Sequence, residues 1–198
     1  MEEVQETSKS RQASLETYQK PIPIQSVVID QSVLHSTGIP ECDAVLGGGI
    51  TQGGVVLLGG EPGIGKSTLS LQMGQQMAVQ GATVLYVSAE ESLQQIKCRA
   101  QRIGPLPDGL YLMSEISIHR ITQAIRDLKP DLVILDSIQV VYSPDLSAVS
   151  GSVGQVRQCA HEFISVVKEV GASGVLIGHI TKDGALAGPK VLEHLVDA

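Results

Sequence analysis

The feature that most constrains this chain is a glycine-rich stretch that directly follows an apolar run. The run "VVLLGG" (55–60) is typical of a strand buried on both faces of a parallel sheet. The stretch "GEPGIGKST" (60–68) fits the phosphate-loop pattern GxxxxGK(S/T), in which glycines let successive backbone N–H groups face phosphate oxygens. A helix predicted over 66–79 adds its positive end, and Lys66 places a compact charge on the β- and γ-phosphates. The pattern predicts a nucleotide site whose phosphate-binding residues are Gly60, Glu61, Pro62, Gly63, Ile64, Gly65, Lys66, Ser67 and Thr68.

Strands and helices alternate along most of the chain. Apolar runs predict strands at 21–29, 55–60, 83–88, 109–113, 131–136 and 173–178. Helical periodicity predicts helices at 40–46, 66–79, 91–103, 117–128 and 152–170. This alternation is typical of an α/β fold, and it predicts a mostly parallel, twisted sheet flanked by helices.

The composition narrows the class of protein. Hydrophobic residues make up 42% of the 198 residues, which is enough for one domain with a sizeable core. The formal net charge of −7 excludes a broadly basic nucleic-acid domain, so any contact with DNA must be local. No apolar run reaches the roughly 18 residues that a membrane span requires. Residues 1–20 are polar without an apolar face, so we expect a flexible leader there and one domain over 21–198.

The cysteines indicate a reducing compartment. Cys42, Cys98 and Cys159 lie far apart and form no CxxC pair, so they predict neither a disulfide framework nor a metal site. We expect them to be buried or half-buried free thiols. The acidic N-terminus does not have the pattern of a secretory signal, and the expected location is the cytoplasm.

Carboxylates at predicted strand ends complete the expected site. Asp136 ends the run "LVILD" and is expected to hold Mg²⁺ together with the Ser67 hydroxyl, although an Asp in this place can also be only a turn residue. The stretch "YVSAEES" places Glu90 and Glu91 just after the strand at 83–88. If that strand lies beside 55–60, one carboxylate can orient the water that attacks the γ-phosphate. We favour Glu90 and expect Glu91 to open a helix in solvent; alternatively, both are helix N-terminal acids favoured by the dipole.

Two absences narrow the nucleotide chemistry. The sequence contains no NKxD motif, the pattern that recognises guanine, which favours ATP over GTP. Its arginines are few and scattered, which argues against a small-molecule kinase with an arginine-rich lid.

The last predicted strand ends in a polar cluster, "GHITKDG" (178–184). In a parallel sheet, ligands bind at the carboxyl ends of the strands. We therefore expect His179 and Thr181 beside the γ-phosphate. One of them, or Lys182 next in line, is expected to distinguish ATP from ADP and to transmit that difference to the following loop.

Long stretches of the sequence resemble a known family. The segment "TGIPECDAVLGGGITQGGVVLLGGEPGIGKSTL" resembles the RecA/KaiC superfamily of ATPases, and "YVSAEES", "DSIQ", "GSVGQVRQ" and "GHITKDGALAGPKVLEHLVD" resemble the bacterial RadA (Sms) family. The resemblance implies a RecA-like P-loop NTPase core. It implies a DNA-stimulated ATPase that works as a hexameric ring on single-stranded and branched double-stranded DNA, in recombination, repair and branch migration. It assigns phosphate and Mg²⁺ binding to Lys66 and Ser67, Mg²⁺ to Asp136, and the catalytic water to Glu90.

The chain departs from the family in three places. RadA proteins begin with a four-cysteine zinc module, carry a Lys-Asn-Arg-Phe-Gly stretch after the core, and end in a Lon-protease-like domain. This sequence contains none of the three. We therefore expect a fragment that stops where another core strand should begin, with zinc confined to an N-terminal module of a longer parent protein.

Two glycine- and serine-containing segments are candidates for DNA contact. By their position in RecA-like rings, 139–158 and 181–190 would face the central channel, and their cations are Arg157, Lys182 and Lys190. The alternative is that both are ordinary mobile surface loops. Two other functions also stay open, namely a KaiC-like signalling ATPase that forms rings without DNA and a nucleotide-gated assembly scaffold with negligible turnover.

Overall fold

The computed structural model describes residues 23–26, 34–179 and 192–198, and the chain divides into two compact units, Met1–Gln31 and Ser32–Ala198. In the first unit, η1 (Ile24–Ser26) is a single 3-10 turn, closed by a 2.8 Å hydrogen bond from the Ser26 N–H to the Pro23 carbonyl. The prediction of a strand over 21–29 is therefore wrong at residues 24–26, which form this turn. Most of its other residues, like the leader at 1–20, lie outside the described residues, and the domain boundary stays a prediction.

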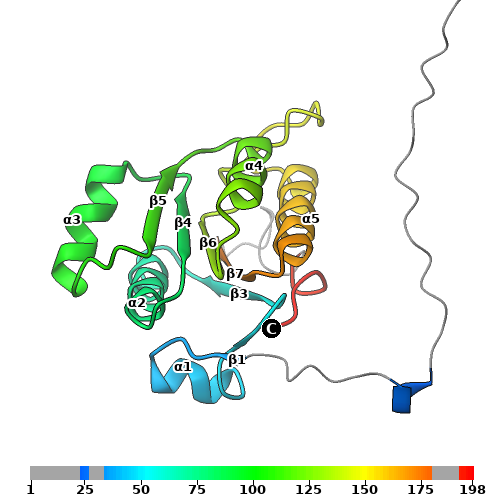
Figure 1. Ribbon diagram of the computed structural model, residues 1–198. Helices are drawn as coiled ribbons and strands as arrows, with labels where there is room; N and C mark the ends of the chain where they lie inside the picture. Colours follow the sequence, from blue (N-terminus) through cyan, green and yellow to red (C-terminus); the bar gives the residue numbers. More distant parts are fainter. Residues whose placement is uncertain (1–22, 27–33, 180–191) are drawn as a thin grey trace, which may run out of the picture. The chain divides into compact units, whose positions relative to one another are not determined.

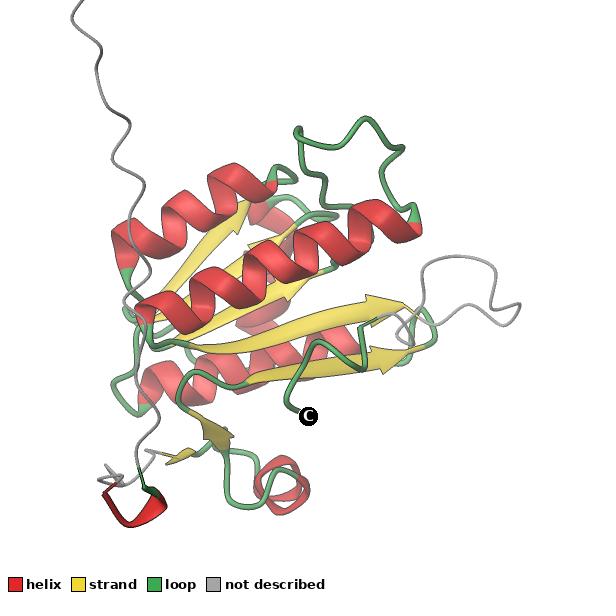
Figure 2. Ribbon diagram, turned by 90° about the vertical axis from the view of Figure 1, so that its right-hand side faces the viewer, coloured by secondary structure: helices red, strands yellow, loops and turns green. Residues whose placement is uncertain are grey.

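A parallel sheet forms the centre of the second unit (Figure 1). Within the described residues its strands are β3 (Val55–Gly60), β4 (Val84–Ser88), β5 (Leu110–Ser114), β6 (Leu132–Asp136) and β7 (Ser173–His179). Their order across the sheet is β3–β7–β6–β4–β5, and all point the same way (Figure 2). Strands β4 and β6 are buried along their whole length, because helices cover both faces. The predicted α/β fold with a RecA-like core is confirmed.

Helices cover the two faces of the sheet in pairs (Figure 1). Helices α2 (Lys66–Val79) and α3 (Leu93–Ile103) pack on one face, and α4 (Ile118–Leu128) and α5 (Val153–Val170) pack on the other. The strand order explains this division. The chain moves from β3 to β4 and β5 in one direction across the sheet and returns through β6 to β7. Right-handed crossovers in opposite directions place their helices on opposite faces.

Aliphatic side chains fill both interfaces, as the low aromatic content requires. The interface beneath α4 and α5 contains Ile121, Ile125 and Phe163, all fully buried. The interface beneath α2 contains Leu71 and Ile134. The chain therefore has two continuous cores, one on each side of the sheet.

A small antiparallel unit precedes the sheet. It consists of β1 (Leu34–His35), α1 (Pro40–Val45) and β2 (Ile50–Thr51), and β1 pairs with β2. The turn before α1 is held by Asp43, which accepts hydrogen bonds from the Ser36 hydroxyl at 2.6 Å and from the Thr37 N–H at 2.8 Å and hydroxyl at 2.7 Å. Burial alone would raise the pKa of Asp43, but these hydrogen bonds outweigh it and lower the pKa.

The last residues of the chain lie against the outer edge of β3. The Asp197 N–H donates to the Val55 carbonyl at 2.9 Å, and the Leu57 N–H donates to the Ala198 carbonyl at 2.8 Å. The Asp197 carboxylate also accepts a hydrogen bond from the Val55 N–H at 2.9 Å. These contacts cover part of an edge strand that would otherwise expose its backbone groups.

The structure tests the expected burial of the cysteines and the search for a membrane-spanning helix. Cys159 is buried and Cys42 is half-buried, as expected, but Cys98 is exposed on α3. Burial raises the pKa of the Cys159 thiol to about 12. Among the described helices, none is long and apolar enough to cross a membrane.

Gly174 of β7 packs tightly against side chains of β3 and α5, and it yields a test of the packing. A Cβ there would lie 3.1 Å from Val55, 3.3 Å from Phe163 and 3.4 Å from Val167, all of them side chains in the core. We expect Gly174→Ala to lower the free energy of unfolding by about 1–3 kcal/mol through overpacking. Chemical denaturation would measure this change. As a control, Gly154→Ala on α5, where no atom lies within 4 Å, should leave stability unchanged or raise it by up to about 1 kcal/mol. Equal effects of the two substitutions would contradict the packing.

Candidate nucleotide site

The carboxyl ends of neighbouring strands meet at one edge of the sheet. The register pairs Gly60 of β3 with His179 of β7, and Asp136 of β6 with Ser88 of β4, while β6 and β7 pair with each other. The phosphate loop follows Gly60, and Glu90 follows Ser88 by two residues. Residues from four separate parts of the chain therefore meet beside the start of α2.

The phosphate loop has the geometry of an anion cradle. Gly63 and Gly65 have φ angles of +80° and +105°, which favour glycine, and a Cβ at either position would have no atom within 4 Å. Gly65 is the residue before α2, and no side-chain hydrogen bond caps this helix. The first N–H groups of α2 thus face the loop without a capping side chain, which suits a phosphate. Helix α2 spans Lys66–Val79, as predicted.

Lys66 is held inside this loop. Its ammonium donates hydrogen bonds to the carbonyl oxygens of Gly60 and Glu61, each at 2.8 Å, and the residue is buried. Burial lowers the pKa of the Lys66 ammonium, although the negative charges of Asp136 and Glu90 oppose that shift. A buried ammonium close to two carboxylates is suited to bind phosphate oxygens, and a metal ion could lie between those oxygens and the carboxylates.

Asp136 is a buried carboxylate at the end of β6, with 4% of its surface exposed. Its Oδ2 accepts a 2.6 Å hydrogen bond from the hydroxyl of Tyr86, which is fully buried in the middle of β4. Burial, together with the Asp136 charge, raises the pKa of this phenol well above its usual range, so it stays a donor. The sequence analysis missed Tyr86, since a tyrosine within an apolar strand looks like any core residue.

Glu90 and Glu91 have separate environments. The Oε1 atom of Glu90 accepts a hydrogen bond from the Ser137 hydroxyl and lies 3.3 Å from Nε2 of His179. Glu91 instead forms an ion pair with Arg99 at 2.6 Å. Glu91 also precedes the helix, because Ser92 is the N-cap of α3. The expectation that Glu91 opens a helix in solvent is therefore wrong, and the geometry favours Glu90 as the carboxylate that faces the site.

The condition given for Glu90, that its strand lies beside 55–60, is not met. Strands β7 and β6 lie between β3 and β4. Glu90 reaches the common edge because Ser137 follows β6 and His179 ends β7, and both contact its carboxylate. Crossover connections allow strands far apart in sequence to lie between consecutive ones, so sequence order does not give spatial order.

His179 is the last residue of β7, one position inside the strand rather than after it. The Gln139 side-chain amide donates a 3.3 Å hydrogen bond to the His179 carbonyl. Gln139 belongs to the stretch "DSIQ" and was not predicted as a site residue. Thr181, Lys182 and Lys190 lie outside the described residues, so their expected roles stay predictions.

Hydrogen bonds join the segment between β6 and α5 to the first turn of α5. The side-chain amide of Gln155, which is buried, donates to the carbonyl oxygens of Ser143, Leu146 and Ala148 at 3.0–3.1 Å. Its oxygen accepts the Ser143 N–H at 2.8 Å. The described part of this segment is therefore tied to α5 and is not a free loop. Arg157 is exposed on α5, and among the described residues it has no contact with Glu90, Lys66 or Asp136.

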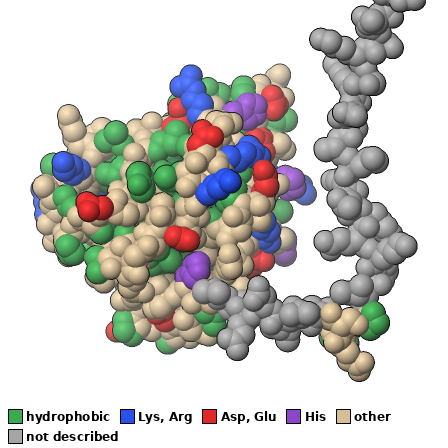
Figure 3. Space-filling model, in the orientation of Figure 1, with side chains coloured by type: hydrophobic (Ala, Val, Ile, Leu, Met, Phe, Trp, Pro, Cys, Tyr) green, Lys and Arg blue, Asp and Glu red, His purple; other side chains and the backbone are tan. Residues whose placement is uncertain are grey.

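Charges on the side of α4 and α5 are mixed in sign (Figure 3). The ion pairs there include Arg126 with Glu169 at 2.9 Å and Lys168 with Asp197 at 3.2 Å. This face is therefore not a continuous basic surface, in agreement with the net charge of −7.

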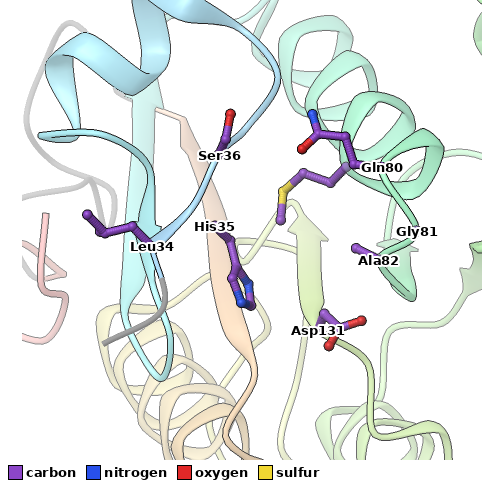
Figure 4. Close-up of a pocket in the computed structure, with 8 residues that line it drawn as sticks. Leu34, His35, Ser36, Gln80, Gly81, Ala82 and Asp131 are labelled. Atoms are coloured by element: carbon purple, nitrogen blue, oxygen red, sulfur yellow. The ribbon is translucent and has the colours of Figure 1, made fainter. Parts of the chain in front are cut away.

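A hollow of about 460 Å³ lies at the opposite edge of the sheet (Figure 4). Its lining includes His35, Gln80 at the end of α2, and Asp131 just before β6. The carbonyl end of α2 and a carboxylate disfavour an anionic ligand. This hollow is therefore not the nucleotide site.

Comparisons with known proteins agree with this geometry. The sequence pattern of the AAA domain matches residues 18–185. The chain belongs to the AAA-domain family. This match supports the expected class of enzyme, a P-loop ATPase.

Individual relatives narrow the resemblance. The DNA repair protein RadA of Halalkalibacterium halodurans is 48% identical over 179 residues, which are 90% of this chain and 39% of that protein. The RadA proteins of Bacillus subtilis and Listeria monocytogenes are 45% and 42% identical, over 93% and 100% of this chain and 40% and 44% of their own lengths. The predicted resemblance to the RadA family is confirmed. The chain spans about two fifths of the length of these curated relatives.

The position of Lys66 gives a direct test of the site. We expect Lys66→Ala to weaken binding of a fluorescent ATP analogue about 10- to 100-fold, because a charge-assisted contact with phosphate is lost. Lys97→Ala, which removes an exposed lysine from α3, is the matched control and should bind as the wild type does. Thermal unfolding would show that both variants fold. Unchanged affinity of a folded Lys66→Ala variant would exclude this loop as the nucleotide site.

Proposed function

We propose that this chain is the ATPase core of a RadA-type DNA repair protein, and that it uses ATP and Mg²⁺ to act in recombination and branch migration on DNA. The observation that supports this most is the meeting of the phosphate loop, Asp136, Glu90 and His179 at one edge of the sheet. An edge with these groups can bind a triphosphate, hold a metal and orient a water.

The residues of the loop and its neighbours suit Mg²⁺ and ATP. The backbone N–H groups of 60–68, other than Pro62, which has none, would bind the phosphates together with the start of α2. The Lys66 ammonium would exchange its backbone carbonyls for the β- and γ-oxygens. The Ser67 hydroxyl and the Asp136 carboxylate are the groups that would hold the metal. When bound, Mg²⁺ neutralises charge on the β- and γ-phosphates.

Glu90 is the proposed catalytic carboxylate. Ser137 and His179 both engage its Oε1 and fix the direction of the side chain. Its other oxygen can accept a hydrogen bond from the water that attacks the γ-phosphorus. Attack forms the new O–P bond as the bond to the β-phosphate oxygen breaks, and ADP and phosphate leave.

His179 is the proposed link between the nucleotide and the segment after β7. It contacts Glu90 through its ring and Gln139 through its carbonyl. A γ-phosphate that competes for the imidazole would change both contacts. We propose that this change distinguishes ATP from ADP and is transmitted to the segment 181–190. Thr181 and Lys182 are the alternative candidates for the sensing residue.

DNA is the proposed partner, because the relatives are named DNA repair proteins. Arg157, Lys182 and Lys190 are the proposed contacts. Their small number on an acidic chain favours a ring of subunits, which we propose to be a hexamer, because a ring repeats these cations around the DNA. A neighbouring subunit would supply the further cation at the γ-phosphate. The cytoplasm is the proposed location, and zinc would belong to a separate N-terminal module of the parent protein.

Substitution of Glu90 tests the catalytic assignment. We expect Glu90→Gln to retain ATP binding and to lower turnover about 10²- to 10⁴-fold, since the amide cannot take a proton from water. Phosphate release under saturating ATP is the measurement. Glu41→Gln, an exposed change on α1, is the matched control. Equal turnover in wild type and Glu90→Gln would remove Glu90 from catalysis, and negligible turnover in both would favour a nucleotide-gated scaffold.

Coupling to DNA is tested with oligonucleotides. We expect single-stranded DNA to raise ATP turnover, and the apparent affinity to fall with salt by roughly one log unit per log unit for each phosphate contact. His179→Ala should keep basal turnover measurable and reduce the stimulation. An unchanged rate with DNA, together with no binding at low salt, would overturn the DNA role and favour a ring-forming signalling ATPase. Full stimulation of His179→Ala would exclude His179 as the sensor.

A further inference from the structure

A line of polar groups, buried at Asp136 and Tyr86 and partly exposed at Arg99 and Glu91, leads from Asp136 away from the nucleotide site to α3. The Tyr86 hydroxyl donates to Oδ2 of Asp136 at 2.6 Å. An Nη2–H group of Arg99 in turn donates to the Tyr86 oxygen at 3.4 Å. Arg99 is joined to Glu91 by an ion pair of 2.6 Å. The line therefore connects β6, β4 and α3 with the segment that carries Glu90.

We propose that Tyr86 is a positioning residue for the metal site, and that Arg99 supports it. The phenol holds Oδ2 of Asp136, so that Oδ1 would be the oxygen available for holding the metal. The inference rests on the proposed Mg²⁺–ATP site. It adds to that site a tyrosine and an arginine that contact neither the nucleotide nor the metal.

The surroundings of Tyr86 give its hydroxyl little freedom. The residue is fully buried in the middle of β4, and its ring packs in the core beneath α2. The hydroxyl oxygen also lies 3.5 Å from the carbonyl oxygen of Ser67, in the first turn of α2. Tyr86 thus touches both elements that carry the proposed metal ligands. A phenol has one proton, and the short distance assigns it to Asp136.

The hydrogen bond matters because Asp136 is buried. A carboxylate with 4% exposure requires donors to offset its lost hydration. Carboxylates that bind metals are commonly hydrogen-bonded by neighbouring groups, and loss of such a partner typically costs about 10- to 100-fold in metal affinity. If Tyr86 served only to fill the core, phenylalanine would serve equally well and would bury no hydroxyl.

Arg99 strengthens this arrangement from the other side. Its side chain is 22% exposed, and Glu91 balances part of its charge. A guanidinium that donates to the phenol oxygen polarises the hydroxyl and makes it a better donor to Asp136. The effect of Arg99 therefore passes through Tyr86, and its loss should matter less than the loss of the phenol.

Magnesium titration of nucleotide binding tests the proposal on the full chain. We expect Tyr86→Phe to raise the Mg²⁺ concentration at half-maximal binding of a fluorescent ATP analogue roughly tenfold or more. Binding in EDTA should be unchanged, because the phosphate loop is intact. Tyr111→Phe removes the same hydroxyl from a half-exposed position on β5 and is the matched control, with wild-type behaviour expected. Thermal unfolding without ligand would show that Tyr86→Phe folds.

Arg99→Met and the double variant Arg99→Met/Tyr86→Phe test whether Arg99 acts on Asp136 through Tyr86. Arg99→Met should raise the Mg²⁺ midpoint less than Tyr86→Phe does, and in a Tyr86→Phe background it should add little, because it acts through the phenol. An Mg²⁺ midpoint of Tyr86→Phe equal to that of wild type would overturn the positioning role while leaving the nucleotide site intact. Equal weakening with and without Mg²⁺ would show a structural role only. If the wild type itself showed no Mg²⁺-dependent binding, the proposed site and this inference would both be wrong.

Discussion

The parallel register of β3, β7, β6 and β4 is the constraint on which the site depends. It places Gly60 opposite His179 and Asp136 opposite Ser88, so that the carboxyl ends of these strands share one edge. A shift of one residue in any pairing would turn a strand's side chains to the other face of the sheet. The two cores hold the register, because each face carries its own set of buried aliphatic side chains.

Burial of charge at that edge explains most of the other contacts. Lys66 and Asp136 are both buried, and each is bonded to partners from the protein. The lysine uses carbonyls of its own loop, which a ligand can replace. Asp136 uses Tyr86, a side chain of another strand that is buried in the core. The partners of Lys66 thus belong to the phosphate loop itself, whereas the partner of Asp136 belongs to the core.

Features that depend on neighbouring residues could be predicted from the sequence, whereas contacts between distant segments could not. Helix α2 has its predicted bounds, and β6 ends at Asp136 as expected, because periodicity and apolar runs are local signals. The spatial order of the strands was not predicted, since the sequence of a crossover does not indicate where the next strand inserts in the sheet. Tyr86 and Gln155 were missed for a similar reason. The hydrogen-bond partner of a polar side chain within an apolar or helical pattern is known only from the folded structure, because the partner lies in a distant segment.

The sequence by itself determined the phosphate loop, the α/β class and the carboxylates that end or follow strands, because each depends on neighbouring residues and short-range geometry. Only the tertiary structure decided which residues each of the two carboxylates contacts. Glu90 meets Ser137 and His179, while Glu91, one residue later, turns to Arg99. Two adjacent glutamates have nearly identical local propensities. Their different environments arise from β6, β7 and α3, which are brought together by burial of the sheet and not by their place in the chain.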